Sequence, residues 1–468
     1  MTRAAPSSPA VLLALLVAAL LASTSGRAVA APFHGVGVTT LFASDGTLVP
    51  GGAGHLDEVA AAGIPLARMD AAWPAVQPFG PGDWRWVTTD RIAGALAARG
   101  IRWLPVLGYA TSWSTTVGGT DKAAPADPAA FAAYAAAVAQ RYGPGGAFWA
   151  AHPELPALPV DAVEIWNEPN IPAYWRPSPD PAAYATLYRA ARDAVHAAAP
   201  GVAALVGGLS PYGDPTGFLR AMHAARPDLA GRLDGVALHP YSPTPAGVVA
   251  IVADVRATLT ELGAGSVPIS VTELGWPRPN QSPTASFALP DDTRAGSIAF
   301  VADALAASDC DVDRLALFTW ATPMRDPVEQ EDWFGLTGFD GTRTPAAQAL
   351  SDAAAGAPPR GPLPICGPGR AAPAPPLPLG LTAWLAGGAG PEPGGDRCVA
   401  ARVTYRDLPV RGIEVRFQRP GDTAVSRLTD DRGEAVRCLA PAREPVRVWA
   451  SAGGGAWASS TLTAVAVR

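Results

Sequence analysis

Short apolar runs alternate with Ala-rich stretches between residues 34 and 355, and this alternation restricts the fold more than any other feature of the sequence. The runs are rich in Val, Ile and Leu, which favours buried strands. Eight of them are expected to be β-strands: 35–42, 64–70, 101–109, 160–168, 203–209, 235–241, 268–276 and 314–320. Eight strand–helix units predict an α/β fold, a closed (β/α)8 TIM barrel rather than an open doubly wound sheet.

Helices are expected between the strands, for example over 90–100, 127–143 and 180–200. In the last two, Asp127 and Asp180 are each followed by Pro, which is typical of a helix N-cap and first turn. No Gly-x-Gly-x-x-Gly motif follows the first strand, which argues against a dinucleotide-binding fold. No cofactor is expected.

The first 30 residues have the pattern of a secretion signal. Arg3 supplies the positive region, residues 11–23 form an apolar core, and Ala28-Val29-Ala30 is an A-x-A cleavage site. The apolar core is too short for a comfortable membrane span, and no later segment qualifies as one. The sequence therefore predicts a secreted, extracellular protein that begins near Ala31 and has no membrane span after signal removal.

The charge pattern argues against nucleic acid as a partner. The chain has 35 Lys and Arg against 41 Asp and Glu, a net charge of −6, and no run of basic residues. Binding to a phosphate backbone depends on such basic surfaces.

Four cysteines are present, which in an oxidising compartment suggests two disulfides. Of the three pairings, we favour Cys310–Cys366 and Cys398–Cys438, because each then lies within one domain. The alternative is that all four are free buried thiols. The spacings do not suggest a metal site, and none is expected.

A change in composition divides the rest of the chain. Residues 31–355 are expected to be the barrel, and the Pro-rich segment 356–377 reads as a semi-rigid linker. Residues 378–468 contain short alternating runs separated by Gly, Pro and Asp, the pattern of a small β-sandwich.

Catalytic groups of such barrels lie where the strands end. Here the fourth strand ends in Glu168, the seventh in Glu273 and the sixth in His239 and Tyr241, while the second carries Arg68. Two glutamates on one rim fit glycoside hydrolysis, in which one carboxylic acid protonates the leaving oxygen and one carboxylate attacks the anomeric carbon.

These motifs resemble glycoside hydrolase clan A, the retaining (β/α)8 glycosidases, with family 39 nearest and cellulase-like families close. The resemblance rests on Trp166-Asn167-Glu168-Pro169, Thr272-Glu273 and the stretches 66–86, 103–113 and 331–350. Leu274-Gly275-Trp276 departs from family 39, in which an aromatic residue followed by Asn is expected, so xylosidase specificity is not predicted. Residues 408–415 and 429–435 resemble bacterial immunoglobulin-like domains, expected to act as a spacer or a stabilising module.

The resemblance implies Glu168 as general acid/base, Glu273 as nucleophile and Asn167 as the partner of the sugar 2-hydroxyl. The charge of Glu273 would help keep Glu168 protonated until the glycosyl-enzyme forms. Glu168 could then ionise and act as the base. The substrate implied is a β-linked oligo- or polysaccharide.

Five more residues are predicted to contact the substrate or the glutamates. The resemblance implies that Arg68 and Tyr241 orient the nucleophile, that His239 contacts the substrate or Glu168, and that Trp320 forms the floor under the sugar. Trp113 is one of several aromatic residues near strand ends that could stack on sugar rings. Alternatively, His239 is a core histidine and Arg68 only bridges strands.

Two other functions compete with hydrolysis. One is a catalytically inactive barrel that binds saccharides or acts in surface display. The other is a transglycosylase, which shares the covalent intermediate but passes the sugar to another sugar.

Overall fold

The computed structural model describes residues 35–39, 52–115, 117–283, 287–322, 326–338, 340–356, 362–367, 375–386, 397–439 and 444–466. The predicted secretion signal lies outside these residues. Residues 31–468 form one compact unit.

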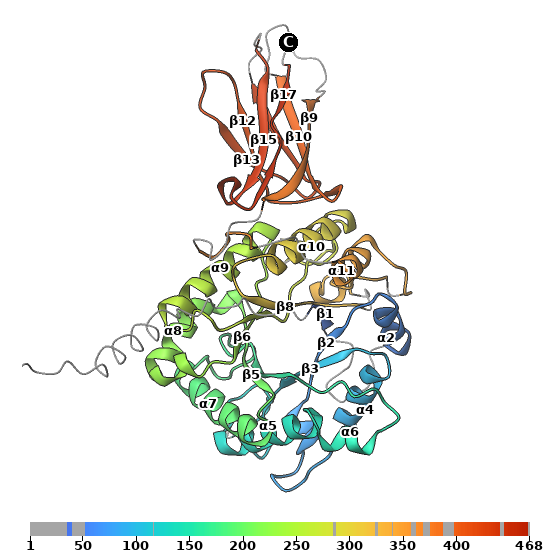
Figure 1. Cartoon of the computed structure of the whole chain (residues 1–468), viewed down its shortest axis with the longest axis vertical. Helices are drawn as coiled ribbons and strands as arrows, with labels where there is room; N and C mark the ends of the chain where they lie inside the picture. Colours follow the sequence, from blue (N-terminus) through green and yellow to red (C-terminus); the bar gives the residue numbers. More distant parts are fainter. Residues whose placement is uncertain are drawn as a thin grey trace, which may run out of the picture. The chain divides into compact units, whose positions relative to one another are not determined.

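The eight predicted strands form a closed, parallel barrel in sequence order, so this fold prediction is confirmed (Figure 1). Closure comes from β1, which pairs in parallel with both β2 and β8. β5 has the predicted bounds, whereas β3, β4, β6, β7 and β8 end before the predicted runs do. The bounds of the eight strands are β1 Val36–Thr39, β2 Leu66–Asp70, β3 Arg102–Leu107, β4 Ala162–Asn167, β5 Ala203–Leu209, β6 Gly235–Leu238, β7 Ile269–Val271 and β8 Val312–Leu317.

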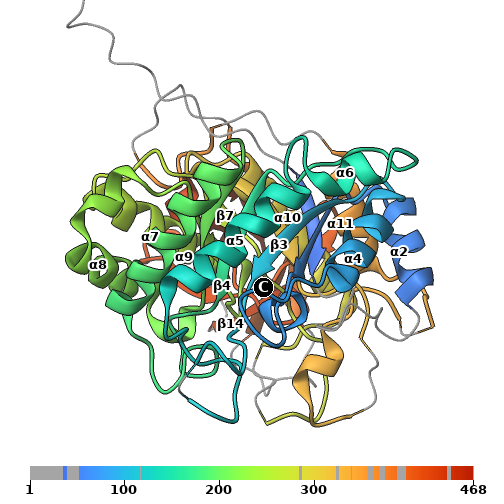
Figure 2. The same ribbon diagram turned by 90° about the horizontal axis from the view of Figure 1, so that it is seen from below.

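Helices surround the barrel in the view of Figure 1, and Figure 2 shows the same helices from below. They are α2 Gly52–Ala61, α3 Trp73–Val76, α4 Val87–Ala97, α5 Pro128–Tyr142, α6 Ala147–Ala151, α7 Pro181–Ala198, α8 Pro215–Ala225, α9 Pro245–Glu261, α10 Asp291–Ala306 and α11 Pro345–Ala355, with short 3-10 turns η1 Pro211–Gly213, η2 Pro227–Gly231 and η3 Gln330–Trp333. Asp127 and Asp180 cap α5 and α7 as predicted, because each side chain accepts a hydrogen bond from a backbone N–H in the first turn.

A buried tyrosine on α7 fixes the spacing of the two strands that carry much of the site. The hydroxyl of Tyr184 donates to the carbonyl of Ile165 on β4 at 2.7 Å and accepts from the N–H of Gly207 on β5 at 2.7 Å. These contacts satisfy polar groups that would otherwise be buried without partners. They hold the carboxyl ends of β4 and β5 in register.

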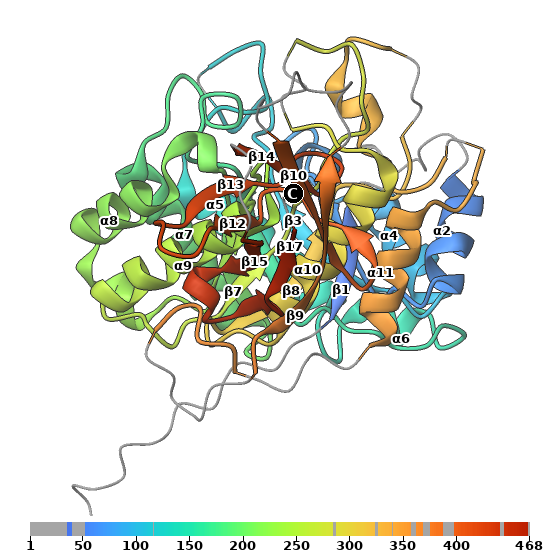
Figure 3. The same ribbon diagram turned by 90° about the horizontal axis from the view of Figure 1, so that it is seen from above.

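The C-terminal region is made of strands, as predicted (Figure 3). Long strand β9 pairs antiparallel with β10 and parallel with β16, and so joins the two groups of strands. The bounds are β9 Leu377–Ala386, β10 Arg397–Tyr405, β11 Leu408–Pro409, β12 Glu414–Gln418, β13 Val425–Leu428, β14 Glu434–Leu439, β15 Val446–Ala452, β16 Ala458–Ser460 and β17 Thr463–Val465, with the 3-10 turn η4 Gly453–Gly455 before β16. Cys398 and Cys438 face each other across β10 and β14 and form a disulfide.

Contacts with this region explain why α10 lacks a polar face. The phenyl ring of Phe300 packs against the rings of Tyr405 and Trp457, each at 5.4 Å between centroids. Asp303 accepts a hydrogen bond from the Tyr405 hydroxyl at 2.6 Å. Because neighbours cover the helix on all sides, residues 293–305 are all buried.

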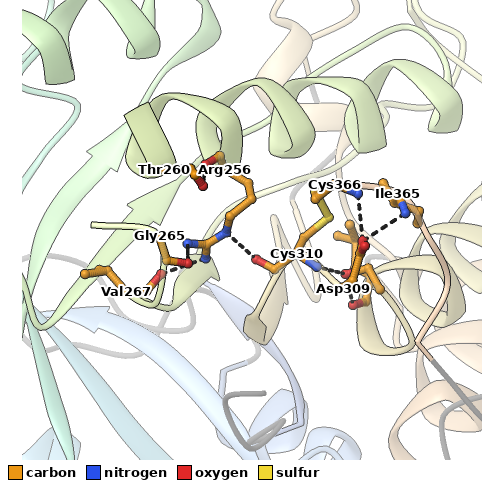
Figure 4. Close-up of a disulfide and its surroundings, with 10 residues drawn as sticks. Arg256, Thr260, Gly265, Val267, Asp309, Cys310, Ile365 and Cys366 are labelled. Carbon is orange, nitrogen blue, oxygen red and sulfur yellow. Dashed lines mark hydrogen bonds between the residues drawn. A yellow bond between two sulfur atoms is a disulfide. The ribbon is translucent and has the colours of Figure 1, made fainter. Parts of the chain in front are cut away.

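The second disulfide joins Cys310, just before β8, to Cys366 in the predicted linker (Figure 4). Both pairings are those favoured from the sequence. Figure 4 shows the carboxylate of Asp309 accepting from the N–H groups of Ile365 and Cys366, at 2.9 and 2.7 Å. Arg256 donates to the Cys310 carbonyl at 2.9 Å. Residues 362–367 are therefore fastened to the barrel rather than extended away from it.

No helix among the described residues is both long enough and apolar enough to span a membrane.

Candidate active site

The backbone turns sharply at the end of β4, within the Trp166-Asn167-Glu168-Pro169 motif. Trp166 and Glu168 have φ angles of 70° and 43°, in the left-handed region that non-glycine residues rarely adopt. The Trp166 indole donates to the Tyr174 carbonyl at 2.7 Å, and the Glu168 N–H donates to the Gly208 carbonyl at 3.1 Å. Strained backbone of this kind is concentrated at functional sites. The turn is held from both sides and places the Glu168 side chain beside His239.

Glu168 and Glu273 converge on one imidazole. Nδ1 of His239 lies 3.0 Å from Oε1 of Glu168 and 3.6 Å from Oε2 of Glu273. The His239 side chain is fully buried, and the two carboxylates are 11% and 18% exposed. Two acidic groups from distant parts of the chain thus share one nearly enclosed site, and His239 is more than a core histidine.

Gly208 on β5 leaves the space that the His239 ring fills. A Cβ atom at this position would lie 2.0 Å from Nε2 of the imidazole. Nε2 is 4.0 Å from Glu164, and within the described chain it has no hydrogen-bond partner. The ring is consequently held by packing, with Nδ1 directed at the glutamates.

Glu273 receives two hydrogen bonds from strong donors. Arg68 donates through Nη1 to Oε2 at 3.1 Å, and the Tyr241 hydroxyl donates to Oε1 at 2.8 Å. Burial, together with the negative charge of Glu273, raises the pKa of Tyr241 well above its usual value, so the phenol keeps its proton. The two donors together fix the orientation of the Glu273 side chain.

Glu164 is a residue that the sequence places wrongly. Its position near the start of a predicted strand indicates a solvated side chain, but the structure buries that side chain fully in the barrel. It accepts from Nε and Nη2 of Arg68 at 2.8 and 2.7 Å and from the Gly208 N–H at 2.8 Å. The same Nη2 donates to Oδ1 of Asn167 at 2.7 Å. Arg68 therefore connects β2 and β4 as well as contacting Glu273.

The ion pair of Glu164 and Arg68 shifts the pKa of both residues. Burial alone raises the pKa of the Glu164 carboxyl, but the charge and hydrogen bonds of Arg68 outweigh it, and the net shift is downward. Burial alone lowers the pKa of Arg68, and the charges of Glu164 and Glu273 reverse that effect. Both groups are thus ionised at neutral pH.

Replacing Glu164 with Gln is expected to lower the free energy of unfolding by about 3 to 5 kcal/mol, because it leaves a buried guanidinium without its principal partner. Since the pKa of Glu164 is lower in the folded than in the unfolded chain, its stabilising contribution is present at neutral pH and is lost as the pH falls through the folded-state value. Denaturant unfolding at pH 7 measures the loss. Glu261→Gln, which removes the partner of exposed Arg220, is the matched control and should leave the midpoint nearly unchanged. Equal midpoints for the two variants would contradict the expectation.

The indoles of Trp113 and Trp320, two of the aromatic residues predicted to contact the substrate, donate hydrogen bonds to groups other than the glutamates. The Trp113 indole donates to the Gln77 carbonyl at 2.7 Å and packs edge-on against Trp73. The Trp320 indole is 2% exposed and donates to Oε2 of Glu58 on α2 at 3.0 Å. Among the described residues neither indole has a recorded contact with Glu168 or Glu273, and their roles in stacking stay predictions.

Three further residues lie near the pair. Tyr174 is one of the aromatic residues near strand ends that could stack on sugar rings, and burial, followed by the charges of Glu168 and Glu273, raises its pKa. Asp70 and Glu331 are given no role from the sequence. Asp70 ends β2, and its pKa is raised first by burial. Glu331 on η3 is partly exposed, and its pKa is raised by burial and by neighbouring carboxylates. Asp70 could have been found by its place at a strand end, whereas Glu331 follows a loop whose path no local pattern predicts.

One group of the described residues has the composition of a metal site, namely Asp309, Cys310 and Cys366. Its two sulfurs are joined in the disulfide of Figure 4, and thiolates would be needed to bind a metal. The group is therefore structural.

No protein-family model matches the chain, and no curated protein matches its sequence. Solved structures do match its fold. A glucosidase from Croceicoccus marinus aligns with a TM-score of 0.55 at 14% identity, over 88% of this chain and 94% of that one. A family 39 glycoside hydrolase from the gut symbiont Bacteroides cellulosilyticus WH2 aligns with a TM-score of 0.52 at 18% identity, over 87% and 79%.

A monomeric β-xylosidase from Caulobacter crescentus CB15 aligns with a TM-score of 0.53 at 15% identity, over 87% of this chain and 94% of that one. The alignments cover 87 or 88% of this chain, which is more than the barrel alone occupies. They thus include part of the C-terminal strands. The chain therefore resembles these glycosidase structures in fold over most of its length.

Proposed function

We propose that the protein is a secreted retaining glycoside hydrolase that cleaves a β-linked saccharide through a covalent glycosyl-enzyme. The observation that carries the proposal is the convergence of Glu168 and Glu273 on Nδ1 of His239, at 3.0 and 3.6 Å. The fold is shared with a glucosidase, a β-xylosidase and a family 39 glycoside hydrolase, which supports a saccharide as the substrate.

The distance between the carboxylates supports retention of configuration. The two oxygens that approach Nδ1 can be no further apart than the sum of 3.0 and 3.6 Å, which is 6.6 Å. Retaining enzymes place their carboxyl groups about 5 to 5.5 Å apart, whereas inverting enzymes separate them by about 6.5 to 9.5 Å to admit a water. The bound excludes all but the lower limit of the inverting range for these two oxygens, which supports direct attack by one carboxylate.

The hydrogen bonds favour Glu273 as the nucleophile. A nucleophilic carboxylate must be ionised and oriented, and Arg68 and Tyr241 donate to both of its oxygens. Glu168 has neither donor, and its recorded side-chain neighbour is His239. With Glu273 as the nucleophile, Glu168 is the remaining carboxyl group of the pair and takes the role of general acid.

In the first half-reaction, Glu168 gives its proton to the glycosidic oxygen while an oxygen of Glu273 attacks the anomeric carbon. The bond from that carbon to the leaving group breaks, and an ester to Glu273 forms. Asn167, held by Arg68 through its carbonyl oxygen, keeps its amide N–H groups available for the sugar 2-hydroxyl.

In the second half-reaction, Glu168 is ionised and takes a proton from water as the water oxygen attacks the anomeric carbon. The ester bond breaks, and Glu273 leaves as a carboxylate that Arg68 and Tyr241 again stabilise. The two inversions together return the sugar with its original β configuration, and Glu168 regains its proton.

Export and domain organisation belong to the same proposal. A signal at residues 1–30, a catalytic domain at 31–355, a linker at 356–377 and an immunoglobulin-like domain at 378–468 fit the composition of each segment. The two disulfides support an oxidising, extracellular location.

The decisive experiment combines stereochemistry with trapping of the intermediate. With an aryl β-glycoside as substrate, proton NMR should show the β anomer of the sugar before mutarotation. A 2-deoxy-2-fluoro β-glycoside with a good leaving group should label the peptide that contains Glu273, as read by mass spectrometry. The Glu273→Gln variant is the control and should remain unlabelled.

Three outcomes would overturn parts of the proposal. First release of the α anomer would replace retention with inversion. Binding of glycans without turnover on any β-glycoside would favour the inactive saccharide-binding barrel. Transfer of the sugar to an added acceptor in preference to water would identify a transglycosylase.

A further inference from the structure

A second aromatic feature lies on the flank of the barrel and is not used by the proposed reaction. The loop 77–86 between α3 and α4 exposes Phe79 at 74% and Trp84 at 39%, and Val87 follows at 70%. Helices α4, α5 and α6 are neighbours on this side of the molecule (Figures 1 and 2). Exposed aromatic residues gathered in one short segment are typical of an interaction site.

Trp84 and Trp86 form a rigid, offset stack. Their ring centroids are 5.6 Å apart and their planes differ by 12°. The guanidinium of Arg141 lies 5.0 Å from the Trp86 ring and is itself held by two hydrogen bonds to Asp90, at 2.8 and 2.6 Å. An offset stack at this spacing leaves part of each ring face uncovered.

Hydrogen bonds to α3 and within the loop hold the segment 77–86 in place. Gln77 is buried, accepts from the Trp73 indole at 2.7 Å and donates to the Pro81 carbonyl at 2.6 Å. The Arg85 N–H donates to the Val76 carbonyl at 2.8 Å. Because these contacts order the loop without any ligand, binding to the indoles would cost little conformational entropy.

A hollow of about 570 Å³ opens beside the stack. Besides the two indoles, it is lined by small or polar residues of α5, of the turn before α6 and of the first position of α6: Ala137, Gln140, Arg141, Gly145, Gly146 and Ala147. The side chain of Gln140 is exposed, and within the described chain its amide has no recorded hydrogen bond. The hollow thus combines aromatic rings, open space and a free amide.

We propose that this hollow is a non-catalytic binding site for a β-linked polysaccharide chain. Trp84 would stack on the C–H face of a pyranose ring, and Gln140 would bond its hydroxyl groups. The choice of a saccharide as the occupant rests on the function proposed above. A neutral sugar fits a hollow with rings on one side and small residues on the other, whereas a stable protein partner needs about 800 Å² on each side.

Affinity gel electrophoresis of the full chain tests the site, with soluble β-1,4-xylan, mixed-linkage β-glucan or β-1,4-galactan cast in the gel. All variants carry Glu273→Gln so that the polysaccharide is not cut. At least one polysaccharide should retard the parent protein, and Trp84→Ala should weaken that binding roughly 3- to 10-fold. Gln140→Ala should weaken it too. Phe79→Ala removes an aromatic residue of the same loop that does not line the hollow, and it should migrate as the parent does.

The proposal would be overturned if the Trp84→Ala and Phe79→Ala proteins were retarded equally. It would also be overturned if none of the three polysaccharides retarded the parent protein. A concentration-dependent dimer that Trp84→Ala abolishes would overturn it as well, because it would identify a protein contact. In the chain with Glu273 intact, Trp84→Ala should leave kcat/KM for small aryl glycosides unchanged. If retardation depends on Trp84 but the chain with Glu273 intact hydrolyses no glycoside, the proposed catalysis is contradicted and the proposed binding site is still supported.

Discussion

Replacing Glu273 with Gln is expected to lower kcat/KM for aryl β-glycosides by about 10⁴- to 10⁶-fold, the scale on which loss of a covalent nucleophile acts. The amide keeps nearly the same shape and still accepts from Tyr241, but it has no negative charge with which to attack the anomeric carbon. Initial rates over a range of substrate concentrations give the ratio. The loss should be similar for good and poor leaving groups, because the attacking atom itself is missing.

Glu261→Gln serves again as the control, because it also removes one carboxylate charge but from an exposed ion pair with Arg220. Its kcat/KM should equal that of the unaltered protein. A Glu273→Gln protein that keeps a tenth or more of the activity would show that another group makes the covalent bond.

Replacing Glu168 with Ala is expected to lower kcat/KM by about 10²- to 10⁴-fold for saccharides with sugar leaving groups, which need a proton to depart. Dinitrophenyl glycosides need little protonation, so their first step should be nearly unaffected and the intermediate should accumulate as a burst. Azide should then accelerate turnover and form a β-glycosyl azide, because a small anion can attack without a base. Rates with and without azide, together with product analysis, measure this.

Glu168→Gln is the matched variant for this test. Its amide fills the space that azide would enter, so azide should not rescue it. If Glu168→Ala acts on natural saccharides as fast as the unaltered protein does, Glu168 is not the acid. Rescue that yields an α-glycosyl azide would instead indicate that Glu273 forms no covalent intermediate.

The sequence was sufficient to predict the barrel and the six polar residues that meet at its rim. Strand alternation identifies where each strand ends, and a closed parallel barrel brings all those ends to one face, so Glu168 and Glu273 had to approach each other. The same reasoning places Arg68, Asn167, His239 and Tyr241 near them, and the structure has all four in contact with a glutamate or with each other.

Side chains within the barrel were harder to predict. Glu164 lies in an otherwise apolar strand. Because a buried carboxylate needs a cation as its partner, the presence of Arg68 on β2 could have indicated that Glu164 is buried. The orientation of Trp320 toward Glu58 depends on how α2 packs, which no pattern of residues in β8 specifies. Loop geometry is also non-local, so the stack of Trp84 on Trp86 could not be foreseen from a segment that looked like an ordinary loop.

The two hydrogen bonds from Arg68 to Glu164 have a consequence for the timing of the proposed reaction. Esterification of the attacking glutamate would remove part of the negative charge that faces this guanidinium, and without another bonded carboxylate the arginine side chain could rotate away. Glu164, which takes no part in the chemistry, would hold the cation in place while the ester exists. The leaving carboxylate would then meet a hydrogen-bond donor that is already in position.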